Sequence, residues 1–295
     1  MNTQHLQYII EIERTRSISQ AAENLFLGQP NLSRILHDLE QSLGFRIFER
    51  TSRGVRPTER GATFLKHARN VLREMDYIEA LGPRNAVPNR LRVCIPRSAK
   101  LLDATAAYIA SLDPACDLDA RIYECHARRA LEILSAGEAE VGVIRFRVEY
   151  RDYFEEQSVQ RELSLQILSR YRYHLILPQS HPLAVNSTVR ASDLEDFPEI
   201  VHGDNLRTHS RQPNHACRKI YTVDRMAQME LLQTLPGAYM WAPELPESTL
   251  RRWGLIQKSC PDNPTLYHNA VILHPHYAMT EIESGYVQHI MQSCK

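Results

Sequence analysis

A run of polar side chains between Gln29 and His37 carries the residue types that read the edges of DNA bases. Glutamine and asparagine pair with adenine through two hydrogen bonds, and arginine pairs with guanine in the same way. The positions that we assign to this contact are Gln29, Pro30, Asn31, Ser33, Arg34 and His37. Taken alone, the run also fits an amphipathic helix with a solvated polar face, so its neighbours decide the interpretation.

The neighbouring segment is rich in arginine. Five arginines fall within fifteen residues, opposed only by Glu49 and Glu59, and they are Arg46, Arg50, Arg53, Arg56 and Arg60. The turn Thr51 to Arg56 predicts a wing, in which Arg53 enters a minor groove and Arg50 and Arg56 lie on phosphates. Residues 1–73 carry 11 Lys and Arg against 7 Asp and Glu, whereas the remaining residues carry 24 against 28. This asymmetry favours one nucleic-acid-binding module and one that need not touch DNA.

A second group of chemically capable residues follows the strands predicted in the C-terminal part. In open α/β sheets, ligands bind at the carboxyl ends of strands. That rule selects Arg97 and Ser98, Cys125 and His126, Arg145 and Arg147, and His202. Together Arg97, Arg145 and His202 predict an anion site, and the expected ligand is a carboxylate. For each arginine alone a surface salt bridge is the alternative, and for Arg147 it is the favoured one.

Other chemistry is not indicated. His209, His215 and Cys217 lie close together, but they lack the paired spacing of a structural zinc site. Six scattered cysteines without a CxxC pair predict free thiols, with a redox switch at Cys217 as the alternative. No nucleophile elbow, phosphate loop or dinucleotide fingerprint occurs, so we expect no catalytic residue, no metal and no cofactor.

Three helices must position the first group. Apolar spacing predicts helices over 3–14, over a segment capped by Ser17 or Ser19, and over a third segment that Gly44 ends. The third helix is expected to bury Leu32, Ile35, Leu36, Leu39 and Leu43. Residues 45–50 alternate and predict a short strand.

A long helix is predicted from Glu59, with Thr58 as its N-cap. An apolar stripe runs along it through Phe64, Ala68, Val71, Met75 and Ile78, broadened by Leu65 and Leu72. Such a stripe needs a partner surface, so we expect a dimer through this helix, with packing onto the chain's own body as the alternative. Residues 81–90 are predicted to form a hinge. Beyond them, alternating strands and helices predict a parallel α/β sheet.

The spacing Ala21-Ala22-x-x-Leu25, Gln29-Pro30-Asn31-Leu32-Ser33, Leu39-Glu40-x-x-Leu43-Gly44-Phe45 and Phe48-x-Arg50 resembles LysR-type transcriptional regulators. Gly28, Asn31 and the bulky Tyr239 and Trp241 depart from the usual pattern. The resemblance implies an α/β protein with an N-terminal winged helix-turn-helix (1–58), a linker helix and hinge (59–90) and a two-lobed effector-binding domain (91–295). Lobe one is expected over 91–167 and 270–295, and lobe two over 168–268, as in periplasmic solute-binding proteins.

The resemblance also implies partners. These are double-stranded DNA at a promoter dyad, RNA polymerase, a small-molecule effector, and a second dimer that completes a homotetramer. It adds Thr222, at the start of a helix, to the effector site. The alternatives are a two-lobed solute-binding protein without a DNA role and an enzyme on the same fold. The first residues, MNTQHLQYII, lack the pattern of a signal peptide, and no apolar run approaches a membrane span, so we expect a cytoplasmic protein without membrane contact.

Overall fold

The computed structural model describes residues 2–51, 54–80, 89–115, 117–203, 218–275, 277 and 279–294. Contacts divide the chain into two compact units. An N-terminal unit comprises Met1–Asn89 with Ser135–Glu138, and a C-terminal unit comprises Arg90–Leu134 with Ala139–Lys295.

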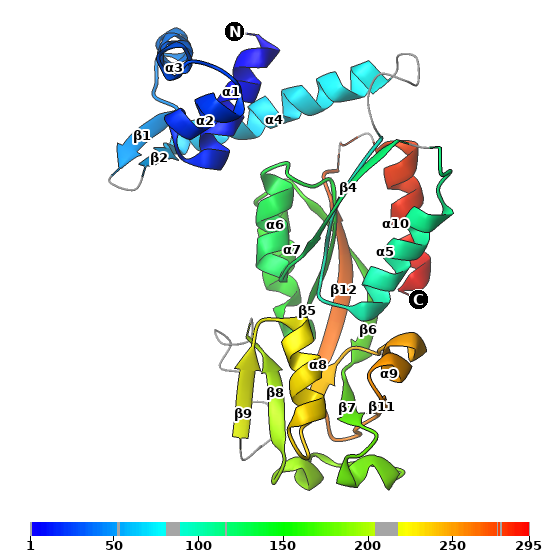
Figure 1. Cartoon of the computed structure of the whole chain (residues 1–295). Helices are drawn as coiled ribbons and strands as arrows, with labels where there is room; N and C mark the ends of the chain where they lie inside the picture. Colours follow the sequence, from blue (N-terminus) through cyan, green and yellow to red (C-terminus); the bar gives the residue numbers. More distant parts are fainter. Residues whose placement is uncertain are drawn as a thin grey trace. The chain divides into compact units, whose positions relative to one another are not determined.

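The N-terminal unit is a three-helix bundle with a hairpin and a long fourth helix (Figure 1). Its elements are α1 (Thr3–Thr15), α2 (Ile18–Asn24), α3 (Gln29–Leu43), β1 (Phe48–Thr51), β2 (Gly54–Pro57) and α4 (Glu59–Ala80). Ser17 caps α2 by accepting a hydrogen bond from the Gln20 amide, as one of the two predicted caps. Gly44 ends α3 in the left-handed conformation at φ 71°, which confirms the predicted stop.

The core of this unit lies between the three helices. Ala21 and Ala22 are buried, and their small side chains allow α2 to approach its neighbours closely. On α3, Leu32, Leu36 and Leu39 are buried, whereas Ile35 and Leu43 are only half-buried. The prediction of a five-residue buried stripe on α3 was therefore too wide.

The predicted strand over 45–50 begins later, at Phe48, and pairs antiparallel with β2. The Glu40 side chain explains the start of the hairpin, because its Oε1 accepts hydrogen bonds from the amides of Ile47 (2.7 Å) and Phe48 (3.1 Å). The segment expected to be a tight turn up to Arg56 is instead a hairpin whose second strand starts at Gly54.

The apolar stripe of α4 divides into two parts. Leu65 and Ala68 are buried within the unit, as the alternative of packing onto the chain's own body requires. Val71, Met75 and Ile78 remain 45%, 36% and 59% exposed. Thr58 caps the helix as predicted, since its Oγ1 accepts a hydrogen bond from the Gly61 amide.

The C-terminal unit contains two groups of strands. The first, here called lobe one, is a five-stranded sheet in the order β4-β3-β5-β12-β6 with helices on both faces (Figure 1). Its strands are β3 (Asn89–Ile95), β4 (Leu118–Glu124), β5 (Val141–Arg147), β6 (Ser164–Arg172) and β12 (Leu266–Leu273). Its helices are α5 (Ala99–Ser111), α6 (Ala127–Ser135), α7 (Arg151–Val159), α10 (Glu281–Ser293) and the 3-10 turn η1 (Val148–Tyr150). One face packs against α6 and α7, and the other against α5 and α10.

The second group, here called lobe two, combines a three-stranded sheet in the order β10-β7-β11 with the parallel pair β8-β9. Its strands are β7 (His174–Pro178), β8 (Pro198–His202), β9 (Arg218–Thr222), β10 (Met240–Ala242) and β11 (Leu255–Lys258). Its helices are α8 (Arg225–Thr234) and α9 (Glu247–Arg252), with 3-10 turns η2 (Pro182–Val185) and η3 (Ala191–Leu194). Met229 and Leu232 of α8 are buried in the lobe's core.

Strands β6 and β12 connect the two lobes. They pair antiparallel along their length, from Leu266 opposite Arg172 to Leu273 opposite Ser164. The prediction of a parallel sheet is confirmed for the β3-β5 pair, whereas β12 runs antiparallel to β5. A parallel strand needs a crossover connection. Strand β12 instead returns directly from lobe two, so no crossover constrains its direction. Helix α7 was not predicted from the sequence.

Candidate functional site

The polar face of α3 places the predicted base-reading residues on one helix. Gln29, Pro30, Asn31, Arg34 and His37 are exposed and Ser33 is half-buried. Arg34 is positioned by its neighbour, since its Nη2 donates to Asn31 Oδ1 at 3.1 Å. Gly28 is the N-cap and supplies no side-chain hydrogen bond, but its carbonyl accepts hydrogen bonds from the amides of Asn31 (2.9 Å) and Leu32 (3.1 Å).

The hairpin presents the predicted phosphate-contacting residues. Arg50 on β1 and Arg56 on β2 are both exposed. Arg56 lies opposite Glu49 in the strand pairing. Arg60 is engaged differently, with its guanidinium 4.4 Å from the centre of the Phe45 ring. Arg53 lies outside the described residues.

A cavity of about 750 Å³ lies between the two lobes of the C-terminal unit and receives side chains from both. Five of the six predicted effector-binding residues line it, and they are Arg97, Ser98, His126, Arg145 and His202. Cys125 lines it as well.

Thr222 is not among the lining residues. It ends β9, and α8 begins only after Asp224, whose carboxylate accepts from the Ala227 amide at 2.8 Å, so the predicted helix start was wrong. Arg145 and Arg147 lie on β5 itself and not beyond it. Arg147 forms a 3.4 Å ion pair with Glu149, as the salt-bridge alternative requires.

Arg145 is held by groups that leave its charge uncompensated. Its Nη1 donates to the Tyr173 hydroxyl and its Nη2 to the Arg97 carbonyl, both at 3.0 Å. Its Nε is buried and has no hydrogen-bond partner, and no carboxylate of the described chain lies within ion-pair distance of it. A buried guanidinium costs free energy unless an anion approaches it. The wall of the cavity therefore contains a buried guanidinium, that of Arg145, to which an anionic ligand could bind.

Tyrosines surround this cation where β6 and β12 leave lobe one, a feature that the sequence analysis missed. The rings of Tyr173 and Tyr267 stack at 4.0 Å with 10° between their planes, and both line the cavity. Tyr171 donates a hydrogen bond to Asn269 Oδ1 at 3.0 Å. Burial raises the pKa of both Tyr171 and Tyr267, so these phenols stay neutral and supply dipoles without charge.

Two of the predicted residues serve as helix caps. Ser98 is buried and its Oγ accepts from the Leu101 amide at the start of α5. His126 Nδ1 accepts from the Arg129 amide at the start of α6, at 3.2 Å. Both residues therefore shape the lobe-one wall of the cavity by fixing where these two helices begin.

The lobe-two wall carries a group that the sequence analysis did not select. Glu199 on β8 is 3% exposed and lines the cavity, with its Oε2 3.8 Å from Lys219 Nζ. Burial raises the pKa of this carboxyl, although the Lys219 ammonium opposes the shift. Nearby, the indole Nε1 of Trp241 is buried without a hydrogen-bond partner. The sequence of β8 did not indicate that Glu199 is buried, because an acidic residue on a strand is usually exposed to solvent.

Polar contacts between described residues of the two lobes include the following three. Arg97 Nη1 lies 3.1 Å from His202 Nδ1, Arg225 Nη2 lies 2.9 Å from Glu124 Oε1, and Lys100 Nζ lies 3.4 Å from Glu244 Oε2. The lobes are thus held by a few hydrogen bonds and ion pairs around the cavity.

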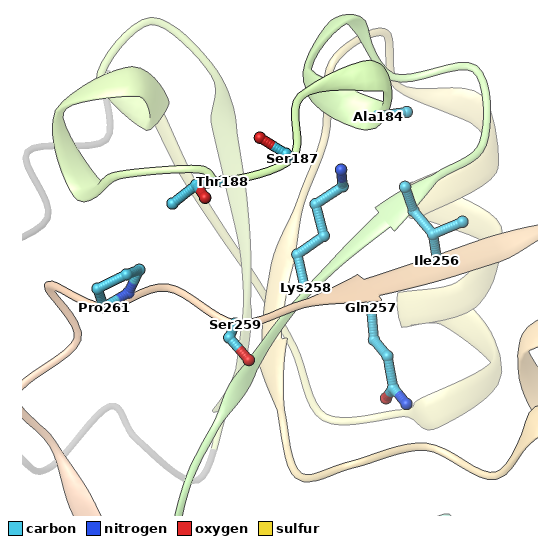
Figure 2. Close-up of a pocket in the computed structure, with 8 residues that line it drawn as sticks. All are labelled: Ala184, Ser187, Thr188, Ile256, Gln257, Lys258, Ser259 and Pro261. Atoms are coloured by element: carbon cyan, nitrogen blue, oxygen red, sulfur yellow. The ribbon is translucent and has the colours of Figure 1, made fainter.

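A second, more open hollow lies within lobe two (Figure 2). Its lining residues are Ala184, Ser187, Thr188, Ile256, Gln257, Lys258, Ser259 and Pro261. The Lys258 ammonium, the charged group among these eight residues, donates a hydrogen bond to the Asn186 carbonyl. This engagement makes the hollow a weaker candidate for an anion than the interlobe cavity.

The described residues hold no cluster of potential metal ligands. Cys94, Cys125, Cys260 and Cys294 are thiols rather than halves of disulfides, while Cys217, Cys116, His209 and His215 lie outside the described residues. Every helix in the described ranges is too short or too polar to cross a lipid bilayer.

Comparison with known proteins links the N-terminal unit to one family. Residues 3–62 match the bacterial regulatory helix-turn-helix protein, lysR family. The HTH-type transcriptional regulator BenM of Acinetobacter baylyi is 29% identical over 218 residues, which cover 71% of this chain and 68% of BenM. These matches set aside the alternatives of an enzyme and of a solute-binding protein without a DNA role.

Solved structures share the fold along the whole chain. A full-length OxyR variant from Pseudomonas aeruginosa superposes with a TM-score of 0.66 at 18% identity, covering 100% of this chain and 94% of that one. Full-length CbnR complexed with its target DNA gives 0.58 at 19% identity, covering 99% and 100%. The chain combines a helix-turn-helix and a basic hairpin with a two-lobed α/β unit, and it belongs to the LysR-type family of DNA-binding transcriptional regulators.

Proposed function

We propose that the protein binds a dyad-related promoter site through α3 and the β1-β2 hairpin, and that a small carboxylate in the interlobe cavity controls this binding. The observation that carries the effector half is Arg145, a buried cation without a carboxylate partner in the described chain, in the wall of a cavity between two lobes.

On the DNA side, Gln29, Asn31 and Arg34 would contact base edges in the major groove. Pro30, Ser33 and His37 would flank them. Arg50, Arg53 and Arg56 would position the module on phosphates and in the minor groove. The described members of this set other than the half-buried Ser33 are exposed, and this exposure supports the assignment.

We further propose a dimer through α4. Its exposed apolar residues Val71, Met75 and Ile78 support this proposal, because an apolar stripe on a helix needs a partner. A two-fold dimer suits a DNA dyad. Assembly of two dimers into a tetramer, contact with RNA polymerase and a cytoplasmic location are parts of the same proposal, as is the division into domains over 1–58, 59–90 and 91–295.

The effector would act by shifting an equilibrium between two arrangements of the lobes. A ligand shifts such an equilibrium only by its difference in affinity for the two states. A carboxylate held by Arg97, Arg145 and Ser98 in lobe one would favour the arrangement in which both lobes contact it. His126 and His202 also line the cavity, and Thr222 would act through His202, opposite which it lies in the β8-β9 pair.

Footprinting of the purified protein on the DNA upstream of its own gene, with and without a panel of carboxylates, tests the proposal. We expect a protected dyad whose length changes with one compound in the wild type and not in Arg145→Gln. Protection that no compound alters in either protein contradicts the effector half. The DNA half is tested by Arg56→Ala, which should lower the slope of log affinity against log salt by about 1. An unchanged slope contradicts the phosphate contact.

A further inference from the structure

We propose that the molecule taken by the interlobe cavity is an amino carboxylate, whose ammonium group is bound by Glu199 while its carboxylate faces Arg97 and Arg145. The carboxylate half of this inference rests on the proposed function. The ammonium half rests on Glu199 and is independent of any sequence pattern.

Glu199 is a buried acceptor that the protein leaves incompletely satisfied. Its Oε2 is buried and has no hydrogen-bond partner. The Lys219 ammonium is 3.8 Å away, which is an ion-pair distance but too long for a hydrogen bond. A charge-assisted N–H···O bond is about 2.7–2.9 Å long. A second ammonium, brought by a ligand, would supply the missing donor.

The exposures of the two partners point the same way. The Glu199 side chain is 4% exposed, whereas that of Lys219 is 32% exposed. A pair built only for stability would be expected to close to hydrogen-bond distance, because removing a carboxylate from water is costly without close partners. Here both side chains line the cavity, and the carboxylate is buried whereas the Lys219 side chain is partly exposed.

The charges of the cavity also favour a ligand that carries both signs of charge. Five lining residues are cationic and two are acidic, and Glu199 is the acidic residue that is buried. An anion without a donor would be attracted by the arginines and repelled by Glu199 in a region of low dielectric. An ammonium on the same molecule turns that repulsion into attraction.

The two lobes would then hold different ends of one ligand. Arg97 and Arg145 belong to lobe one, and Glu199 belongs to lobe two. Trp241, also in lobe two, adds a buried indole N–H that can donate to a ligand oxygen. Because neither lobe satisfies both charges alone, the ligand gains its full contacts only when the lobes are held together around it.

Calorimetric titration of the full-length wild-type protein with matched pairs of probes tests this inference. The pairs are L-glutamate and glutarate, L-phenylalanine and phenylpropanoate, and gamma-aminobutyrate and butyrate. We expect at least one amino compound to bind ten-fold or more tightly than its partner without nitrogen, since a charge-assisted hydrogen bond contributes about 1.5–3 kcal/mol. Equal or tighter binding by the nitrogen-free acids overturns the inference and leaves the carboxylate site intact.

The variant Glu199→Gln should reduce that ratio to near one by weakening the amino compound alone. Glu230→Gln, on the exposed face of α8, is the matched control and should leave the ratio unchanged. A Glu199→Gln protein that keeps the wild-type ratio overturns the ammonium contact. If none of the six probes binds the wild type, the carboxylate site fails as well, and with it the effector half of the proposed function. The affinities of the wild-type protein for the matched probes test the inference even if the Glu199→Gln variant does not fold.

Discussion

Arg97 and His202 meet across the interlobe cavity, with Nη1 of the arginine 3.1 Å from Nδ1 of the histidine. The other ring nitrogen, Nε2, lies 2.9 Å from the carbonyl oxygen of Val223. Because a carbonyl can only accept, Nε2 carries the proton, and the neutral ring accepts from the guanidinium at Nδ1. The imidazole therefore connects Arg97 of lobe one to the segment between β9 and α8.

Replacing His202 with phenylalanine should loosen this connection while keeping a ring of similar size. We expect faster amide hydrogen exchange in β8 and at the start of α5, and a loss of about 1 kcal/mol, the usual worth of a hydrogen bond. Exchange measured by mass spectrometry checks this. His174→Phe on β7, which has no part in the link, is the control, and equal effects of both variants would argue against a specific role for His202.

Arg145→Gln should separate ligand response from stability. Loss of a charge-assisted contact predicts carboxylate binding weaker by about 10- to 100-fold. The unliganded protein should change by less than about 1 kcal/mol, because the hydrogen bonds lost to Tyr173 and the Arg97 carbonyl are offset by removal of a buried unpaired charge. Thermal unfolding with and without ligand measures both quantities. A large loss of stability without ligand would instead identify Arg145 as a structural residue.

The pH dependence of stability should report the burial of Glu199. Burial raises its pKa above the ordinary 4.5, so the folded chain binds this proton more readily than the unfolded chain. The folded state is thus favoured at low pH and loses that advantage as the pH rises through the raised pKa. We expect Glu199→Gln to gain stability relative to the wild type between pH 4.5 and neutral pH. Urea unfolding at several pH values measures the difference, and Glu230→Gln should show no such trend.

The sequence predicted the DNA-facing unit closely because its determinants are local. The caps at Ser17 and Thr58 and the stop at Gly44 each depend on contacts within a few residues. The wing was placed less well, because its start depends on Glu40, seven residues before the first amide that it binds. A side chain that reaches from a helix to a strand leaves no periodic signal.

The cavity was predicted only in part, for a related reason. The rule of strand ends found Arg97 and Arg145, since it depends on one strand and its successor. It could not find Glu199 or Tyr267, which reach the cavity only when β8 and β12, far along the chain, fold beside the first strands. Thr222 was misplaced because a strand ends where a helix start was expected.

Glu40 should be essential for the position of the wing. Glu40→Ala leaves the amides of Ile47 and Phe48 without their acceptor, at a cost of about 1–3 kcal/mol for each buried group. We expect reduced stability and at least ten-fold weaker DNA binding in a gel-shift assay. Glu40→Gln keeps an acceptor oxygen and should retain most of both. Asp38→Ala, exposed on the same helix, is the matched control, and a fall in DNA binding equal to that of Glu40→Ala would refute the wing argument.

A charge in the exposed stripe of α4 should dissociate the proposed dimer. Ile78 is 59% exposed in the single chain, so Ile78→Glu costs the folded chain little, yet it would bury a carboxylate in an apolar helix-helix interface. Sedimentation velocity should give an assembly of at least two 34.0 kDa chains for the wild type and one chain for the variant. Ala62→Glu, exposed near the start of the same helix and away from the stripe, should leave the assembly unchanged. If Ile78→Glu keeps the wild-type mass, the chains associate through another surface, and the stripe must be covered by a different partner.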